Sequence, residues 1–102
     1  MPNVSASWSA YSTPTHTAVT VAVGTTVALA ANTDRVYALF VNDADEAIYL
    51  KLGAAAAMNT GVRLNANGGS YEMSAALGNL YGGAVNAICA SGGKVLLVLE
   101  ST

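Results

Sequence analysis

Hydrophobic and polar residues alternate with a period of two along most of the chain after residue 16, which is the pattern of strands that bury one face. The clearest example runs from Ile48 through Leu50 to Leu52, with Tyr49 and Lys51 at the intervening positions. This stretch predicts a strand with an inward apolar face and an outward polar face. Other apolar-rich runs predict seven further strands, over residues 19–23, 27–30, 34–42, 62–64, 71–74, 84–90 and 94–100.

Two of these predicted strands are apolar on both faces. Residues 35–41 read Arg-Val-Tyr-Ala-Leu-Phe-Val, and residues 94–100 read Lys-Val-Leu-Leu-Val-Leu-Glu. A strand that is buried on both sides loses the polar half of the alternation. We therefore expect the first stretch to be central in a sheet and the second to be covered on each side.

Glycine- and asparagine-rich segments separate the strands. Residues 67–69 (Asn-Gly-Gly) and 91–93 (Ser-Gly-Gly) supply the residue types that adopt positive φ in tight turns. Residues 53–58 (Gly-Ala-Ala-Ala-Ala-Met) favour helix by propensity, but the run is too short to nucleate a stable helix. We predict a loop there, with at most one helical turn. Residues 75–83 are predicted to be a connection that packs down through its two leucines and Tyr81.

Short strands with regular turns and no convincing helix describe an all-β, antiparallel β-sandwich or barrel. The length of 102 residues corresponds to one domain. The first fifteen residues show no periodicity of two or 3.6, and they include Trp8 and Tyr11. We therefore predict an extended N-terminal arm over residues 1–15 and a single β domain over residues 16–102.

The composition suggests a small core and a weakly charged surface. Hydrophobic residues make up 53% of the chain, but 20 of them are Ala, which leaves 24 Ile, Leu, Val and Phe side chains. Charged residues make up only 10%, against about 25% in ordinary domains, and the net charge is −2. Identical copies with few charges repel one another little near a symmetry axis. The composition therefore favours self-assembly.

The charge pattern also excludes some partners. The four cationic residues are too widely spaced to neutralise several phosphates together, so no nucleic-acid partner is expected. No run of 18 apolar residues and no signal peptide is present, so we expect no membrane association and a protein made and kept in the cytoplasm. The four cationic residues are Arg35, Lys51, Arg63 and Lys94.

The chain offers few residues for chemistry. His16 is the single histidine, so a metal site of the cupin type lacks its ligands. Cys89 is the single cysteine and is predicted to be a buried small hydrophobe, because an apolar strand does not activate a thiol for a dyad with His16. Asp43, Asp45 and Glu46 form an acidic turn without the glycine of a calcium loop. We predict no catalytic, cofactor or metal site and no enzyme activity.

Four segments occur in a characteristic order. They are residues 32–43 (NTDRVYALFVND), 47–53 (AIYLKLG), 61–73 (GVRL followed by GGSYEM) and 81–90 (YGGAVNAICA). This order resembles the small jelly-roll capsid decoration, or cement, proteins of tailed bacteriophages. The similarity covers about residues 30–100, its motifs are structural, and the arm lies outside it.

The resemblance implies a jelly-roll β-sandwich of about eight strands on the outer capsid surface of a virion, made in the bacterial host cytoplasm. Such a protein clamps neighbouring subunits of the major capsid protein, commonly as a homotrimer and alternatively as a dimer, and needs no cofactor. We expect Trp8, Tyr11, Tyr71 and Tyr81 at the interface. The alternative is a phage adhesion or fibre-tip module that binds a host surface glycan through Tyr71, Tyr81 and Asn79.

Overall fold

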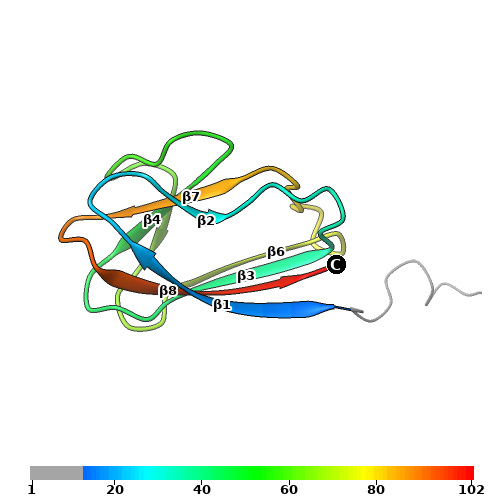
Figure 1. Ribbon diagram of the computed structural model, residues 1–102, viewed down its shortest axis with the longest axis horizontal. Helices are drawn as coiled ribbons and strands as arrows, with labels where there is room; N and C mark the ends of the chain where they lie inside the picture. The colour runs from blue at the N-terminus through cyan, green and yellow to red at the C-terminus, as the bar shows by residue number, and fades with distance from the viewer. Residues whose placement is uncertain (1–12) are drawn as a thin grey trace, which may run out of the picture.

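The computed structural model describes residues 13–102, and these form two four-stranded antiparallel sheets packed face to face (Figure 1). Sheet A has the strand order β1-β8-β3-β6, and sheet B has the order β2-β7-β4-β5. The strands are β1 (Pro14–Val21), β2 (Thr26–Leu29), β3 (Tyr37–Asn42), β4 (Ile48–Leu52), β5 (Val62–Leu64), β6 (Ser70–Ser74), β7 (Val85–Cys89) and β8 (Lys94–Ser101). The predicted all-β antiparallel sandwich is confirmed.

The core lies between the two sheets and follows the alternation in the sequence. Ile48 and Leu50 of β4 point into it and are fully buried, whereas Tyr49 points to the opposite side of sheet B. β3 lies between β8 and β6, so the prediction that this stretch is central in a sheet is confirmed. The buried core consists of Val21, Ala28, Ala38, Phe40, Ile48, Leu50, Leu64, Met73, Val85, Ala87, Cys89, Leu96 and Val98.

The predicted turns form with the expected backbone geometry. Asn67 and Gly68 have φ values of 61° and 114°, and Gly92 and Gly93 have values of 73° and 67°. Residues 53–61 contain turns and bends without a helix, which confirms the predicted loop.

In the 75–83 connection the prediction was partly wrong. Leu80 and Tyr81 are partly buried, but Leu77 is 59% exposed. One half of the connection therefore packs down, and the turn at Leu77 does not.

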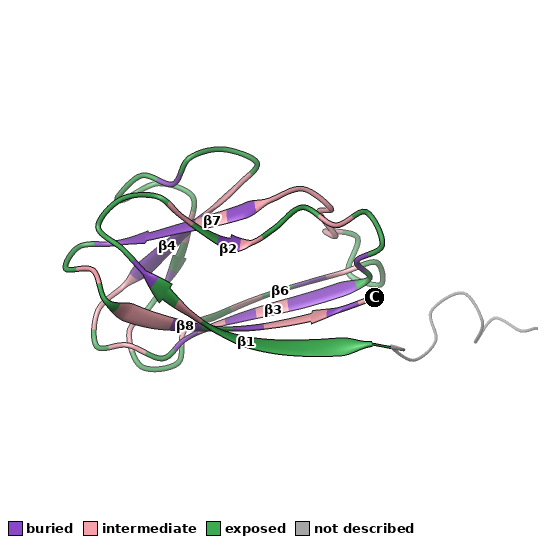
Figure 2. Cartoon of the chain, viewed as in Figure 1, coloured by how far each residue is buried: buried purple, intermediate pink, exposed green. Residues whose placement is uncertain are grey.

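The N-terminal boundary differs slightly from the prediction. β1 begins at Pro14, and its first two residues pair with Ser101 and Glu100, so the sheet starts two residues before position 16. Most of β1 is exposed, as Figure 2 shows, because the short strand β2 covers little of it. Residues 1–12, which hold most of the predicted arm with Trp8 and Tyr11, lie outside the described residues.

Arg35 has a structural role that the strand prediction missed. The predicted strand over residues 34–42 begins only at Tyr37, and Arg35 instead turns into the end of the sandwich, where it is 2% exposed. Its guanidinium donates hydrogen bonds to the carbonyl oxygens of Ala30 at 2.6 Å, Tyr81 at 2.6 Å and Gly83 at 3.1 Å. A buried arginine is tolerated only when its donors are satisfied, and here they join two loops to the start of β3.

Candidate interaction surface

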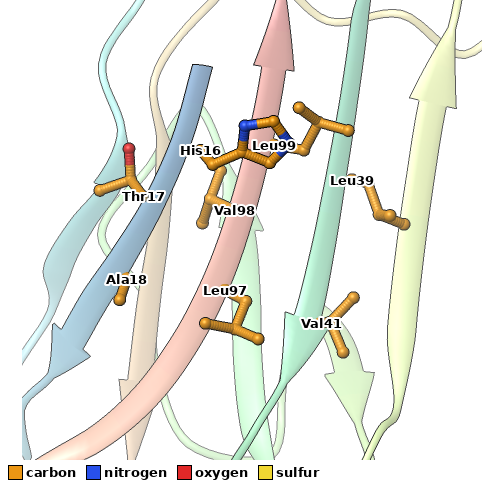
Figure 3. A pocket seen from close by; sticks show the side chains of 8 residues that line it. All are labelled: His16, Thr17, Ala18, Leu39, Val41, Leu97, Val98 and Leu99. Atoms are coloured by element: carbon orange, nitrogen blue, oxygen red, sulfur yellow. The ribbon is translucent and has the colours of Figure 1, made fainter. Parts of the chain in front are cut away.

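The outward face of sheet A carries a shallow apolar groove of about 420 Å³ that crosses β1, β8 and β3 (Figure 3). Residues that are paired across neighbouring strands point to the same face of a sheet. Two such sets of paired residues, each crossing β1, β8 and β3, form the main rows of the groove. We call this surface the sheet A groove. It is lined by His16, Thr17, Ala18, Leu39, Val41, Leu97, Val98 and Leu99.

The strand register sets the two rows. Leu99 lies opposite His16 on one side and opposite Leu39 on the other. Leu97 lies opposite Ala18 and Val41 in the same way. Because β8 lies between β1 and β3, Leu97 is in the middle of its row. Leu97 is 41% exposed.

A polar rim borders the groove on β6. Glu72 pairs with Leu39 and Ser70 pairs with Val41, so each apolar row ends in a polar side chain. The hydroxyl of Tyr37 donates a hydrogen bond to Oε2 of Glu72 at 2.6 Å. At the outward positions of the four described strands of sheet A, Glu72 is the one carboxylate and no lysine or arginine occurs. An apolar centre with a polar rim is the usual composition of a protein contact surface.

Part of the outward face of sheet B is covered by the chain itself. Ala56 of the 53–61 loop packs against Tyr49 and Ile88 to form a second buried cluster. The hydroxyl of Tyr49 also donates to Oδ1 of Asn59 at 2.9 Å, which holds the end of the loop over the sheet. The 53–61 loop therefore covers the apolar pair Tyr49 and Ile88 on sheet B, whereas Val27 at the edge strand β2 is exposed, and among the described residues no loop covers Leu97 on sheet A.

This contrast bears on one prediction, which is confirmed for one face of β8 and stays a prediction for the other. Residues 94–100 are apolar on both faces, and we expected both faces to be covered. The inward residues Leu96 and Val98 are buried. Leu97 on the outward face is exposed to solvent in the described part of the chain. The sequence pattern detected an apolar outward face and could not tell what covers it.

The predicted interface tyrosines do not lie in the groove. Tyr71 points inward from β6, where its ring packs against Phe40 with centroids 6.4 Å apart and an angle of 27° between the ring planes. Tyr81 is half-buried against the core, and its hydroxyl occupies the space beside Gly53 and Gly83. Their role at an interface stays a prediction, as does that of Trp8 and Tyr11, which lie outside the described residues.

Asn79, the third residue of the glycan alternative, is engaged within the chain. Its side-chain oxygen accepts from the backbone N–H of Ser74 at 3.0 Å, and its amide donates to the carbonyl of Glu72 at 2.9 Å. These bonds close the turn after β6. Nδ2 of Asn79 also lies 3.5 Å from the hydroxyl of Tyr71, and the glycan alternative stays a prediction.

Cys89 and His16, the two residues considered for a catalytic dyad, lie on opposite sides of sheet A. Cys89 is fully buried between the sheets, which confirms the predicted burial, and its Sγ lies 3.4 Å from the carbonyl oxygen of Val21. His16 is exposed on the outward side of sheet A, so the structure does not bring the two side chains together.

No helix within residues 13–102 has the length and hydropathy to cross a membrane.

The acidic turn binds its own neighbours. Nζ of Lys94 lies 2.8 Å from Oδ1 of Asp45, and this hydrogen bond holds the pKa of Asp45 below its usual value. The backbone N–H of Ser91 donates to Oε2 of Glu46 at 2.8 Å and lowers the pKa of Glu46. In the described part of the chain, no group of three or more His, Cys, Asp and Glu side chains could hold a metal ion.

Comparisons of the chain with family models, with curated proteins and with solved structures gave no match.

Proposed function

We propose that this protein is a virion structural protein that decorates the outside of a tailed-phage capsid. It binds the major capsid protein as a homotrimer and stabilises the shell by clamping neighbouring subunits. The observation that carries the proposal is the sheet A groove, an open apolar surface centred on Leu97 in a domain with few charges. A protein that acts by burying surface needs such a face.

The strand order supports a jelly-roll domain of the kind used by viral capsid proteins. The chain passes from one sheet to the other at every connection except that between β4 and β5, which are neighbours in sheet B. This arrangement places eight strands in two layers, as a jelly roll requires. The resemblance of residues 30–100 to phage decoration proteins points to the same class.

Shell stabilisation would follow from mass action. A ligand that binds the assembled shell and not its separated subunits raises the stability of the shell by about 2.7 kcal/mol per site at a free concentration of 100 times Kd. A trimer that makes three weak contacts at once binds more tightly than one copy does, because the second and third contacts form at high effective concentration. No residue has to perform chemistry in this mechanism.

The experiment mixes the purified full-length protein with phage shells from which it has been removed. We expect saturable co-sedimentation with the shells and an increase in their melting temperature by calorimetry. Shells that still carry the protein are the control and should bind no more of it. Folded protein that neither binds the stripped shells nor changes their melting would overturn the proposal, and a monomeric mass at every concentration would overturn the homotrimer.

A further inference from the structure

Leu97 at the centre of the sheet A groove is 41% exposed, whereas the 53–61 loop buries Tyr49 and Ile88 on the outward face of sheet B. We propose that the sheet A groove of one copy binds residues 1–12 of a neighbouring copy, with Trp8 as the anchoring side chain. This goes beyond the proposed function because it names the surface and the segment that join two copies, and it holds whether or not the protein binds a shell.

The segment begins beside the groove. Thr13 leads into Pro14 at the start of β1, and His16, three residues after Thr13, lines the groove. The twelve residues that precede Thr13 can span about 40 Å when extended. An eight-residue strand such as β8 is about 26 Å long. The segment is therefore long enough to leave its own sandwich and cross the groove of a neighbour.

The exit direction favours a neighbouring copy over the same chain. The carbonyl oxygen of Thr13 accepts a hydrogen bond from the backbone N–H of Thr102 at 3.4 Å, which continues the ladder between β1 and β8 beyond Pro14. Pro14 also restricts Thr13 to extended backbone. Docking on the same chain would need a reversal directly before Thr13, and residues 9–12 (Ser-Ala-Tyr-Ser) include neither glycine nor asparagine, the residue types that most readily adopt positive φ.

The segment and the groove match in chemistry. Residues 1–12 contain no charged side chain and carry Met1, Val4, Trp8 and Tyr11 as their large apolar groups. The centre of the groove is also uncharged, so burying the segment there costs no desolvation of an ion. A tryptophan buries a large ring and needs an acceptor for its indole N–H, and the rim at Glu72 supplies carboxylate oxygens.

The fluorescence of Trp8 tests the proposal directly, because Trp8 is the single tryptophan of the chain. We expect blue-shifted emission from the wild type, with a shift that grows with protein concentration in step with the oligomer mass from native mass spectrometry. Leu97→Lys should shift the emission to that of a tryptophan in water and remove the oligomer. The control is Val27→Lys, because Val27 is 60% exposed on sheet B, and this variant should change neither readout.

A mixing experiment separates docking between copies from docking within one chain. Leu97→Lys retains Trp8 but has a damaged groove, whereas Trp8→Ala retains the groove and emits no tryptophan fluorescence. If the segment binds a neighbour, adding Trp8→Ala protein to Leu97→Lys protein restores the blue shift. Circular dichroism melting should show that both variants remain folded.

Three results would overturn the inference: water-like emission from the wild type at all concentrations, blue-shifted emission from a monomer, or no restoration of the blue shift on mixing. Shell binding is measured separately by co-sedimentation. Shell binding without Trp8 docking would overturn this inference and leave the proposed function standing, and Trp8 docking without shell binding would do the reverse.

Discussion

The guanidinium of Arg35 donates a hydrogen bond from Nε to Oε2 of Glu100 at 2.8 Å, and the side chain of Arg35 is fully buried while that of Glu100 is 18% exposed. The two residues are 65 positions apart in the chain. The pair joins the segment before β3 to the end of β8. Together with the three carbonyl contacts of Arg35, it closes one end of the sandwich.

Arg35→Ala should lower the free energy of unfolding by about 3–5 kcal/mol, the usual cost of removing one partner of a buried ion pair. The substitution removes the guanidinium from three carbonyl oxygens and from the Glu100 carboxylate, which then keeps the 3.4 Å hydrogen bond from Nδ2 of Asn32. Urea denaturation followed by circular dichroism measures the change. Arg63→Ala is the matched control, because Arg63 is exposed and its guanidinium lies 5.9 Å from the centroid of the Tyr49 ring, a cation–π contact worth about 0.5–1 kcal/mol. Equal losses in the two variants would contradict the role of Arg35.

Asn42→Ala should lower the free energy of unfolding by at least about 2 kcal/mol, because each buried polar group left unpaired costs about 1–3 kcal/mol. The fully buried amide of Asn42 donates to the carbonyl oxygens of Glu46 at 2.8 Å and Leu64 at 3.0 Å, and its oxygen accepts from the N–H of Ala44 at 2.9 Å. Thermal denaturation compares this variant with Asn65→Ala, at an exposed position, which should melt like the wild type.

Gly61→Ala should be more destabilising than Gly78→Ala, although both glycines have left-handed backbone, with φ of 84° and 77°. The left-handed conformation costs a residue with a Cβ about 1–2 kcal/mol at either position. At Gly61 the added Cβ would also overlap the carbonyl oxygen of Leu50, whereas at Gly78 it would meet no atom within 4 Å. Calorimetric melting of the two variants checks the order, and an equal effect would show that the backbone near Leu50 moves freely.

The stability of the protein should fall at acid pH through Glu46. The backbone N–H of Ser91 lowers the pKa of Glu46 from its ordinary value of 4.5, so the native state favours the carboxylate more than the unfolded state does. This contribution is present above pH 4.5 and is lost as the pH falls through the lower pKa of the folded state. Glu46→Gln should reduce the slope of stability against pH in this range. Urea titrations at several pH values measure it, and an unchanged slope would contradict the interpretation.

The strands and turns follow from local residue patterns. In a strand, successive side chains point to opposite faces, so the alternation of Ile48, Leu50 and Leu52 with Tyr49 and Lys51 predicts both the strand and its inward side. The positive φ values of Gly92 and Gly93 follow from glycine having no Cβ. Such properties depend on a few neighbouring residues, and the sequence is sufficient to predict them.

The pairing of residues far apart in the chain could not be predicted in this way. Arg35 looked like the start of an apolar strand, and its burial depends on Glu100 and on the carbonyl oxygens of two loops. The roles of Tyr71 and Tyr81 likewise depend on which strand or glycine lies beside each ring. An aromatic residue in a polar segment is equally compatible with packing inward or facing a partner.

The amino-acid sequence by itself determined the all-β class, the positions of the strands and the two-sided apolar character of residues 94–100, because these depend on the period and type of neighbouring side chains. Only the tertiary structure decided that β8 lies between β1 and β3, that the 53–61 loop covers part of sheet B, and that Leu97 is exposed at the centre of an apolar groove. Strand order and the covering of a face arise from contacts between distant segments, which alternation along the chain does not encode.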